Sequence, residues 1–299
     1  MTESQNRRLS RRDLLRYSAA GLVAVGSSSL LGACSSTEPG TGESTSGLME
    51  RAESGEPIRI AIGNEPPYTK LTADGELTGA APDVAKAVLD RMGITEVEAV
   101  ETAYDSMIPG LTANRWDMVA AGLFMNTSRC DAVLYSSPVI VSTESFALPP
   151  GNPKNISTLE DVKNSDVTVA ALAGSFELKT AKSLGVPESK LQTYPRAPDA
   201  LQGLDDGRVD AILLPTLSLQ ALKEQQNGDF EITEPLEAFP KTGSGAAFRP
   251  SDKEFQAKYN EELKAFKKTQ EFEDILAKWG FDADAARDAT TEELCKTKG

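Results

Sequence analysis

The chain has 299 residues, 39% of them hydrophobic, and 45 acidic against 31 basic residues give a formal net charge of −14. So acidic a surface repels a phosphate backbone, which argues against nucleic acid as a partner. There is no histidine, which excludes Ser-His triads, acid–base catalysis by imidazole and most zinc sites. We expect neither a metal nor another cofactor, and the length allows two domains.

Residues 1–33 have the features of an export signal. Residues 10–16 read SRRDLLR, which resembles a twin-arginine motif, and an apolar stretch rich in Ala, Gly and Ser follows. The stretch ends in LGAC, which resembles a bacterial lipobox, in which the Cys34 thiol receives a diacylglyceryl group and becomes the mature N-terminus. A plain secretory leader is the alternative. Lipidation would hold the mature protein outside the cytoplasm on the cell membrane, through acyl chains alone.

Residues 34–56 are predicted to form a flexible, lipidated tether. They are rich in Ser, Thr, Gly and Glu, a composition that does not bury enough apolar surface to fold. The folded body is therefore expected to begin at Pro57. Nothing after residue 50 is apolar over a length that could span a bilayer.

The first part of the body alternates strands and helices. Apolar runs predict strands, and apolar residues at helical spacing predict helices between them. The loop after the first strand contains two prolines, which cannot continue a strand ladder. The predicted elements are a strand at 58–62, a helix at 82–92, a strand at 96–100, a helix from residue 104 and a strand at 116–121.

Residues 119–131 read VAAGLFMNTSRCD and are expected to form one rim of a ligand site. A buried strand leaves through Gly122 into a loop that carries Phe124, and one of residues 126–128 caps the helix that carries Arg129. Ligands of open α/β sheets bind at the carboxyl ends of strands. A guanidinium there can hold a carboxylate through two parallel hydrogen bonds, and a ring beside it can cover an apolar or cationic ligand.

A second βα unit follows an extended run at 139–148, which PPGNP at 149–153 interrupts. Its predicted elements are strands at 167–172, 191–194 and 211–214 and helices at 176–184, 198–205 and 216–225. A returning strand at 243–248 and amphipathic helices at 252–268 and 271–279 then pack on the first unit. The predicted fold is α/β, with lobe 1 at 57–147 plus 244–299, lobe 2 at 148–243, and two crossing strands that allow closure around a small ligand.

From residue 57 onward the chain resembles the solute-binding subunits of amino-acid-type ABC importers, and within them the ectoine- and hydroxyectoine-binding proteins. The narrower similarity is carried by NEPPY at 64–68, GAAPDV at 79–84, MIPGL at 107–111, AGLFM at 121–125, RC at 129–130 and TEELC at 291–295. The resemblance implies a two-lobe periplasmic-binding-protein-like (type II) fold, a monomer, a small zwitterionic ligand and permease subunits as partners.

The resemblance also implies roles for residues of the first lobe. Glu65 would pair with the cyclic amidinium of ectoine, and Arg129 would hold its carboxylate. Three rings would wall the ligand by stacking and cation-π contact: Tyr68, Tyr104 and Phe124. Each residue alone would more often be a core ring or a surface charge, and their joint placement on rim loops favours a binding site.

The second lobe is expected to add fewer contacts. Relatives that bind ordinary α-amino acids typically place an Asp where this chain has Pro215, and a proline leaves a buried ammonium unpaired. N–H groups of Gly174, Ser175 and Phe176 would assist Arg129 at a helix N-terminus. Relatives are richer in Gly or Thr there, so Phe176 is either a fourth wall or a packing residue.

Three functions remain open on the sequence. The first is capture of ectoine or hydroxyectoine for an importer, and the second is the same role for another zwitterion, such as a betaine, a proline-like solute or an unusual amino acid. The third belongs to another class, because periplasmic dehydratases of this fold act on cyclic carboxylated substrates. An enzyme needs a poised acid or base, for which Glu65 is the obvious candidate. We expect a receptor without catalytic residues.

A disulfide is predicted between Cys130 and Cys295. Cys34 is used for the lipid, and these are the two remaining thiols in an oxidising compartment. The bridge would fasten a polar tail, residues 282–299, over the first lobe and brace the helix that carries Arg129. Two unrelated cysteines are the alternative.

Overall fold

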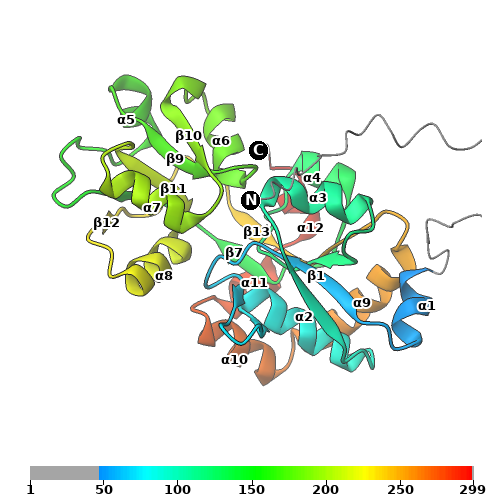
Figure 1. The fold of residues 1–299 in the computed structure, drawn as a ribbon. Helices are drawn as coiled ribbons and strands as arrows, with labels where there is room; N and C mark the ends of the chain where they lie inside the picture. The colour runs from blue at the N-terminus through cyan, green and yellow to red at the C-terminus, as the bar shows by residue number, and fades with distance from the viewer. Residues whose placement is uncertain (1–46, 298–299) are drawn as a thin grey trace, which may run out of the picture. The chain divides into compact units, whose positions relative to one another are not determined.

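The structure is a computed structural model that describes residues 47–297 of the chain, which belong to one compact unit, Ser44–Gly299 (Figure 1). The predicted export signal, Cys34 and most of the predicted tether lie outside the described residues. Within residues 47–297, no helix combines the length and the apolar character needed to cross a membrane.

The first of two five-stranded sheets forms the centre of the first lobe. Its strand order is β4-β1-β5-β14-β6, with β1 parallel to β4 and β5, and β14 antiparallel to β5 and β6. Residues of β1 are buried on both faces, as expected for a strand covered by helices on each side. The strands are β1 (Ile58–Ile62), β4 (Val97–Glu101), β5 (Met118–Val119), β6 (Leu134–Tyr135) and β14 (Ala247–Phe248).

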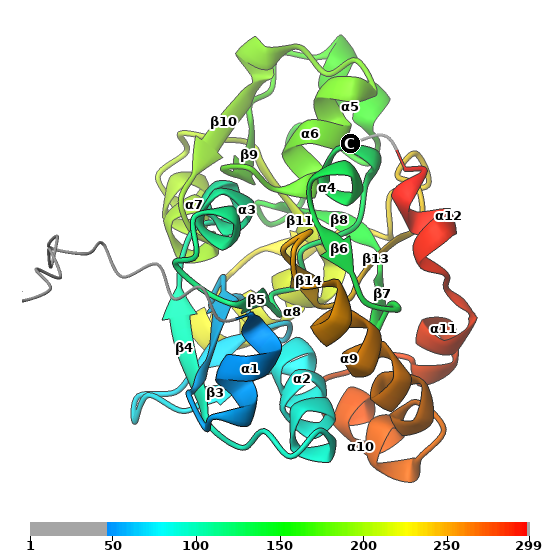
Figure 2. The same cartoon turned by 90° about the vertical axis from the view of Figure 1, so that its right-hand side faces the viewer.

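Helices from both ends of the chain cover this sheet, as Figure 2 shows for the C-terminal ones. In α2 (Ala80–Arg91), Val84 and Val88 are buried one turn apart, which is the helical spacing that predicted the element. The others are α3 (Tyr104–Thr112), α4 (Thr127–Ala132), α9 (Lys253–Phe266) and α10 (Gln270–Lys278), and a hairpin of β2 (Lys70–Leu71) and β3 (Leu77–Thr78) precedes α2.

The second sheet forms the centre of the second lobe, in the order β10-β9-β11-β8-β12. Here β9 is parallel to β10 and β11, whereas β8 is antiparallel to β11 and β12. Its strands are β8 (Glu144–Leu148), β9 (Val169–Leu172), β10 (Leu191–Tyr194), β11 (Ala211–Pro215) and β12 (Glu231–Ile232). Its helices are α5 (Leu159–Asn164), α6 (Phe176–Ser183), α7 (Ala197–Asp205) and α8 (Thr216–Gln226).

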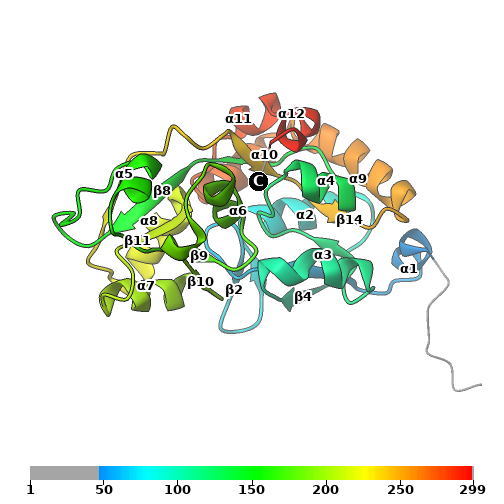
Figure 3. The ribbon, with the colours of Figure 1, turned by 90° about the horizontal axis from the view of Figure 1, so that it is seen from above.

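Two antiparallel strands, β7 (Ile140–Ser142) and β13 (Thr242–Ser244), join the lobes; Figure 1 labels both strands, and Figure 3 shows the two lobes from above. The predicted returning strand at 243–248 is therefore two strands, because β13 pairs with β7 and β14 enters the first sheet. The predicted boundary between residues 147 and 148 falls inside β8. Since all of β8 belongs to the second sheet, the change of lobe occurs before Glu144.

The body begins earlier than the predicted tether allowed. Helix α1 (Leu48–Glu53) buries Leu48 in the core, so residues from 47 onward belong to the folded unit. Arg51 of this helix donates through Nη1 to Asp117 Oδ1 at 2.8 Å. Burial would raise the pKa of Asp117, but hydrogen bonds from Arg59 and Arg51 outweigh it and hold the pKa at about 2.

The C-terminal segment is also more ordered than its polar composition predicted. It forms α11 (Ala283–Asp288) and α12 (Thr291–Cys295), and it buries Ala286, Ala289 and Leu294. A few small apolar side chains are therefore enough to dock a segment that otherwise reads as a loose tail.

Candidate functional site

A small cavity is enclosed by residues of both lobes. The space within it amounts to about 270 Å³, including the part that is open to solvent. Every predicted ligand residue except Gly174 lines it, together with two residues that were not predicted, Gly122 and Glu177. The lining consists of Glu65, Tyr68, Tyr104, Gly122, Phe124, Arg129, Ser175, Phe176, Glu177 and Pro215. The structure thus brings residues from five separate stretches of sequence to one place.

Arg129 is buried, with 4% of its surface exposed, and hydrogen bonds at both its backbone and its guanidinium hold it in place. The side chain of Asn126 caps α4 and accepts from the Arg129 N–H at 2.8 Å. The guanidinium donates through Nη1 to the carbonyl of Phe124 at 2.6 Å and through Nη2 to the carbonyl of Gly174 at 2.9 Å. A guanidinium has five N–H donors, and these bonds orient it while leaving others for an anion.

Glu65 supplies a buried carboxylate on the loop after β1. The hydroxyl of Ser218, from α8 of the second lobe, donates to Glu65 Oε1 at 2.5 Å. Burial raises the pKa of Glu65, and the hydrogen bond from Ser218 only partly offsets that effect. A cation placed against this carboxylate would relieve the cost of burying its charge.

Three rings stand edge to face along the cavity. The ring centroids of Tyr68 and Phe124 are 5.7 Å apart at 75°, and those of Phe124 and Phe176 are 5.9 Å apart at 82°. Phe176 therefore lines the cavity and packs against a predicted wall residue at the same time. Tyr104 forms a further wall, and its hydroxyl donates to the backbone carbonyl of residue 121 at 3.1 Å.

Gly122 makes room for the Tyr68 ring. Its φ is +68°, and an added Cβ would lie 2.6 Å from Cδ1 of Tyr68. At its other end, the Tyr68 hydroxyl shares a short hydrogen bond with the hydroxyl of Ser142, the last residue of β7. The ring is thus fixed between the loop after β5 and a strand that joins the lobes.

The N–H group of Ser175 was predicted to assist Arg129 in holding the ligand, and the structure gives it another partner. Its N–H donates to the carbonyl of Leu172 at 3.1 Å, and its hydroxyl caps α6 by accepting from the Leu178 N–H at 3.2 Å. The Ser175 N–H is therefore engaged within its own lobe and is not offered to a ligand in this geometry. Gly174 contributes its carbonyl, to Arg129, and does not line the cavity.

Glu177 is a charged residue of the site that was not predicted from the sequence. It lies in the first turn of α6, is 3% exposed and lines the cavity. Burial, followed by repulsion from Glu65, raises its pKa to about 7. An acidic residue in the first turn of a helix is ordinary on a surface, and only the position of the turn at the cleft distinguishes this one.

Two further features surround the cavity. A wider space of about 1390 Å³, partly open to solvent, shares Glu65 and Tyr104 with it and is bordered by the end of β4, the start of α7 and α8. Pro215 ends β11, where it pairs with Glu144 of β8, and its side chain offers a ligand no hydrogen-bond acceptor. Residues 47–297 contain no group of three or more His, Cys, Asp or Glu residues placed to hold a metal ion.

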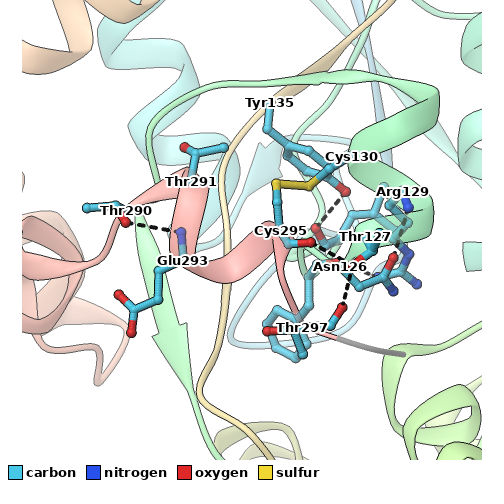
Figure 4. Close-up of a disulfide and its surroundings, with 12 residues drawn as sticks. Asn126, Thr127, Arg129, Cys130, Tyr135, Thr290, Thr291, Glu293, Cys295 and Thr297 are labelled. Atoms are coloured by element: carbon cyan, nitrogen blue, oxygen red, sulfur yellow. Dashed lines mark hydrogen bonds between the residues drawn. A yellow bond between two sulfur atoms is a disulfide. The ribbon is translucent and has the colours of Figure 1, made fainter.

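Cys130 and Cys295 are joined by a disulfide, with their Cα atoms 5.8 Å apart (Figure 4). The bridge connects α12 to α4, the helix that carries Arg129. Thr127 adds two bonds to the same segment, from its N–H to the carbonyl of Thr297 at 3.0 Å and from its hydroxyl to the carbonyl of Cys295 at 2.9 Å.

The comparison with protein families agrees with this architecture. Residues 58–283 match the bacterial extracellular solute-binding proteins, family 3. The chain belongs to this family. The predicted two-lobe α/β fold is confirmed, because solved structures with this fold align over most of the chain.

Named relatives of this family 3 protein are transport proteins. "Probable amino-acid ABC transporter periplasmic-binding protein y4tE" of Sinorhizobium fredii is 34% identical over 249 residues, which are 80% of this chain and 82% of the relative. The L-cystine-binding protein TcyJ of Escherichia coli is 26% identical over 242 residues, with 81% and 88% covered.

Two solved structures bear on the site. EhuB in complex with hydroxyectoine aligns with a TM-score of 0.80 and 41% identity, covering 84% of this chain and 98% of EhuB. The ancestral amino-acid-binding protein AncCDT-1, a precursor of cyclohexadienyl dehydratase, aligns with a TM-score of 0.69 and 27% identity, covering 79% of this chain and 99% of its own.

Proposed function

We propose that this solute-binding protein captures ectoine or hydroxyectoine outside the cytoplasm and delivers it to the permease of an ABC importer. The observation that carries the proposal is the composition of the cavity, which brings together one guanidinium, buried carboxyl groups and aromatic rings. The likeness to EhuB bound to hydroxyectoine supports the same ligand class.

Each end of such a ligand has a partner in the cavity. Arg129 takes the carboxylate, Glu65 faces the amidinium, and Tyr68, Tyr104 and Phe124 surround the ring. The second lobe closes the space with Phe176 and Pro215, which contribute shape and no charge. The amidinium gives the buried Glu65 carboxylate a partner of opposite charge. The site therefore favours a cationic ring over a neutral one.

Glu177 supports a second candidate, a different zwitterion. Pro215 offers no acceptor to an α-ammonium, but Glu177 places a carboxyl group in the second-lobe wall. With a pKa of about 7 it is partly ionised at neutral pH, so an ammonium or quaternary ammonium could pair with it. The same buried acid is also the group that a dehydratase-like enzyme would use.

Titration calorimetry of residues 44–299 separates these candidates. Ectoine and hydroxyectoine should bind, whereas Glu, Gln, Arg and His should bind weakly or not at all. Glu65→Gln should weaken ectoine binding by about 2 to 5 kcal/mol, because a buried charge loses its partner. Binding of a common amino acid without binding of ectoine would contradict the proposal, and product formed from a bound ligand would show an enzyme.

Lipidation of Cys34 is proposed for the mature protein. The family is extracellular, and the predicted lipobox would supply the anchor. Cys34→Ala should abolish partitioning into the detergent phase after signal removal, or leave the signal uncleaved. Equal, fully aqueous partitioning of wild type and variant would show that the lipobox is not used.

A further inference from the structure

Two hydrogen bonds cross the cleft, and each uses a charged group of the cavity. Arg129 Nη2 donates to the carbonyl of Gly174 at 2.9 Å, and the Ser218 hydroxyl donates to Glu65 Oε1 at 2.5 Å. Arg129 and Glu65 belong to the first lobe, whereas Gly174 and Ser218 belong to the second. Separating the lobes would break both bonds, because the donor and the acceptor of each bond lie on opposite lobes and would move apart.

Backbone contact accompanies the first of these bonds. Gly174 has φ +71°, and an added Cβ would lie 2.6 Å from the N, Cα and Cβ atoms of Asp105, at the start of α3 in the first lobe. Backbone atoms cannot rotate away as a flexible side chain can. The lobes therefore reach this separation only because residue 174 lacks a side chain.

We propose that Gly174 and Ser218 are positioning residues that hold the cleft closed by completing the hydrogen bonds of Arg129 and Glu65. The inference rests on the proposed function, in which these two charged groups bind the two ends of a zwitterion. Closure and ligand binding then depend on the same atoms. Ser218 fixes the carboxylate that faces the cation, and the Gly174 carbonyl fixes the guanidinium that faces the carboxylate.

The conformational test uses residues 44–299 with spin labels at Glu98→Cys and Gln192→Cys, exposed positions on β4 and β10. The native cysteines of this unit are paired with each other. Pulsed EPR without ligand should show a smaller short-distance population for Gly174→Ala than for the unsubstituted protein. Gly185→Ala is the matched control: its φ is +92°, and its nearest neighbour is a lysine carbon at 3.8 Å.

Both glycine substitutions carry the strain of a positive φ, but only the one at residue 174 meets the opposite lobe. Equal distance distributions for the two variants would overturn the proposal. This comparison needs no ligand, so it remains decisive even if the protein does not bind ectoine.

The kinetic test uses ectoine as the probe. Ser218→Ala should raise the dissociation rate roughly tenfold, with the association rate changed by less than about twofold, because a hydrogen bond to a charged group is lost only from the closed state. Ser183→Ala, on the exposed end of α6, should leave both rates unchanged. An unchanged dissociation rate for Ser218→Ala in a protein that binds ectoine would overturn the inference alone.

Discussion

The two walls of the cavity are built in different ways. Two side chains of the first-lobe wall have supports within their own lobe: Arg129 lies on a helix that Asn126 caps and donates to the Phe124 carbonyl, and Tyr104 donates to a neighbouring carbonyl. On the second-lobe side, the Gly174 carbonyl and the Ser218 hydroxyl do not line the cavity themselves and bond across the cleft to residues of the first-lobe wall.

This difference separates recognition from closure. Groups that are oriented before the lobes meet can bind a ligand in an open cleft at little ordering cost. Groups that find partners only across the cleft contribute once it closes, and so they govern how long the ligand stays. We therefore expect first-lobe substitutions to abolish binding and second-lobe substitutions to alter its lifetime, its pH dependence and its selectivity.

The largest expected effect is on the first-lobe wall. Arg129→Gln removes the cation that would face a ligand carboxylate and also one bond across the cleft. Ectoine binding should weaken by roughly 4 to 5 kcal/mol, measured by calorimetry. Arg115→Gln, an exposed arginine in the same lobe, is the control and should bind as the wild type does. A loss below about 1 kcal/mol would mean that the carboxylate lies elsewhere.

The next effect concerns the support of that wall. Replacing Cys130 and Cys295 by serine opens a bridge that spans 165 positions, and the free energy of unfolding should fall by about 3 to 4 kcal/mol in urea. Since the bridge braces the helix of Arg129, ectoine affinity should fall as well. Reductant should reproduce the loss in the wild type and have no effect on the variant. Identical unfolding midpoints would show that α12 docks without the bridge.

The first-lobe wall was predictable because its signals are local. Phe124 and Arg129 follow a strand end within one short stretch, and the NEPPY loop at 64–68 carries both Glu65 and Tyr68. The rule that ligands bind at strand ends then places these residues together. The α/β fold was predictable for a related reason, since strand and helix periodicities alternate along the chain.

The second-lobe wall depends on contacts that no local pattern records. Glu177 reads as an ordinary acid in the first turn of a helix, and Ser218 as an ordinary helix serine; only burial against the other lobe gives them roles. Helix α1 was missed for the same reason. Its composition resembles a tether, and Arg51 meets Asp117 from 66 positions away in sequence.

Glu177 provides a test of the second wall that uses pH. Its pKa is about 7 in the folded protein against an ordinary value of 4.5, so the folded state binds its proton more tightly. The contribution of Glu177 to the stability of the folded state is fully present below pH 4.5. It is lost as the pH rises through about 7, and above that pH it does not change further. Glu177→Gln should therefore be more stable than the wild type at pH 8, by on the order of 3 kcal/mol, and nearly equal to it at pH 4.

Urea unfolding of the wild type and of Glu177→Gln between pH 4 and pH 8 measures the difference between their free energies of unfolding. Other titrating groups contribute equally to both proteins, so their contributions cancel in this difference. The groups that act on Glu177 are Glu65, Ser175 and Arg129, and repulsion from Glu177 adds to burial in raising the pKa of Glu144. Glu293→Gln, on the exposed side of α12, is the control and should show no such slope. A constant difference from pH 4 to pH 8 would show that folding leaves the pKa of Glu177 unchanged.

The smallest expected effect distinguishes a wall from a packing residue at Phe176. Its ring touches Phe124 edge to face, whereas Phe124 also touches Tyr68, so Phe124→Ala should cost more ectoine affinity than Phe176→Ala. For Phe176→Ala we expect a loss of about 2 kcal/mol, because one buried ring is removed from the cavity. The ring belongs to the second lobe and would close on the ligand, so most of the loss should lie in a faster dissociation rate.

The space that the Phe176 ring leaves should also reduce the discrimination against bulkier zwitterions, which competition calorimetry would detect. Unchanged ectoine affinity and unchanged selectivity in Phe176→Ala would assign this ring to packing alone.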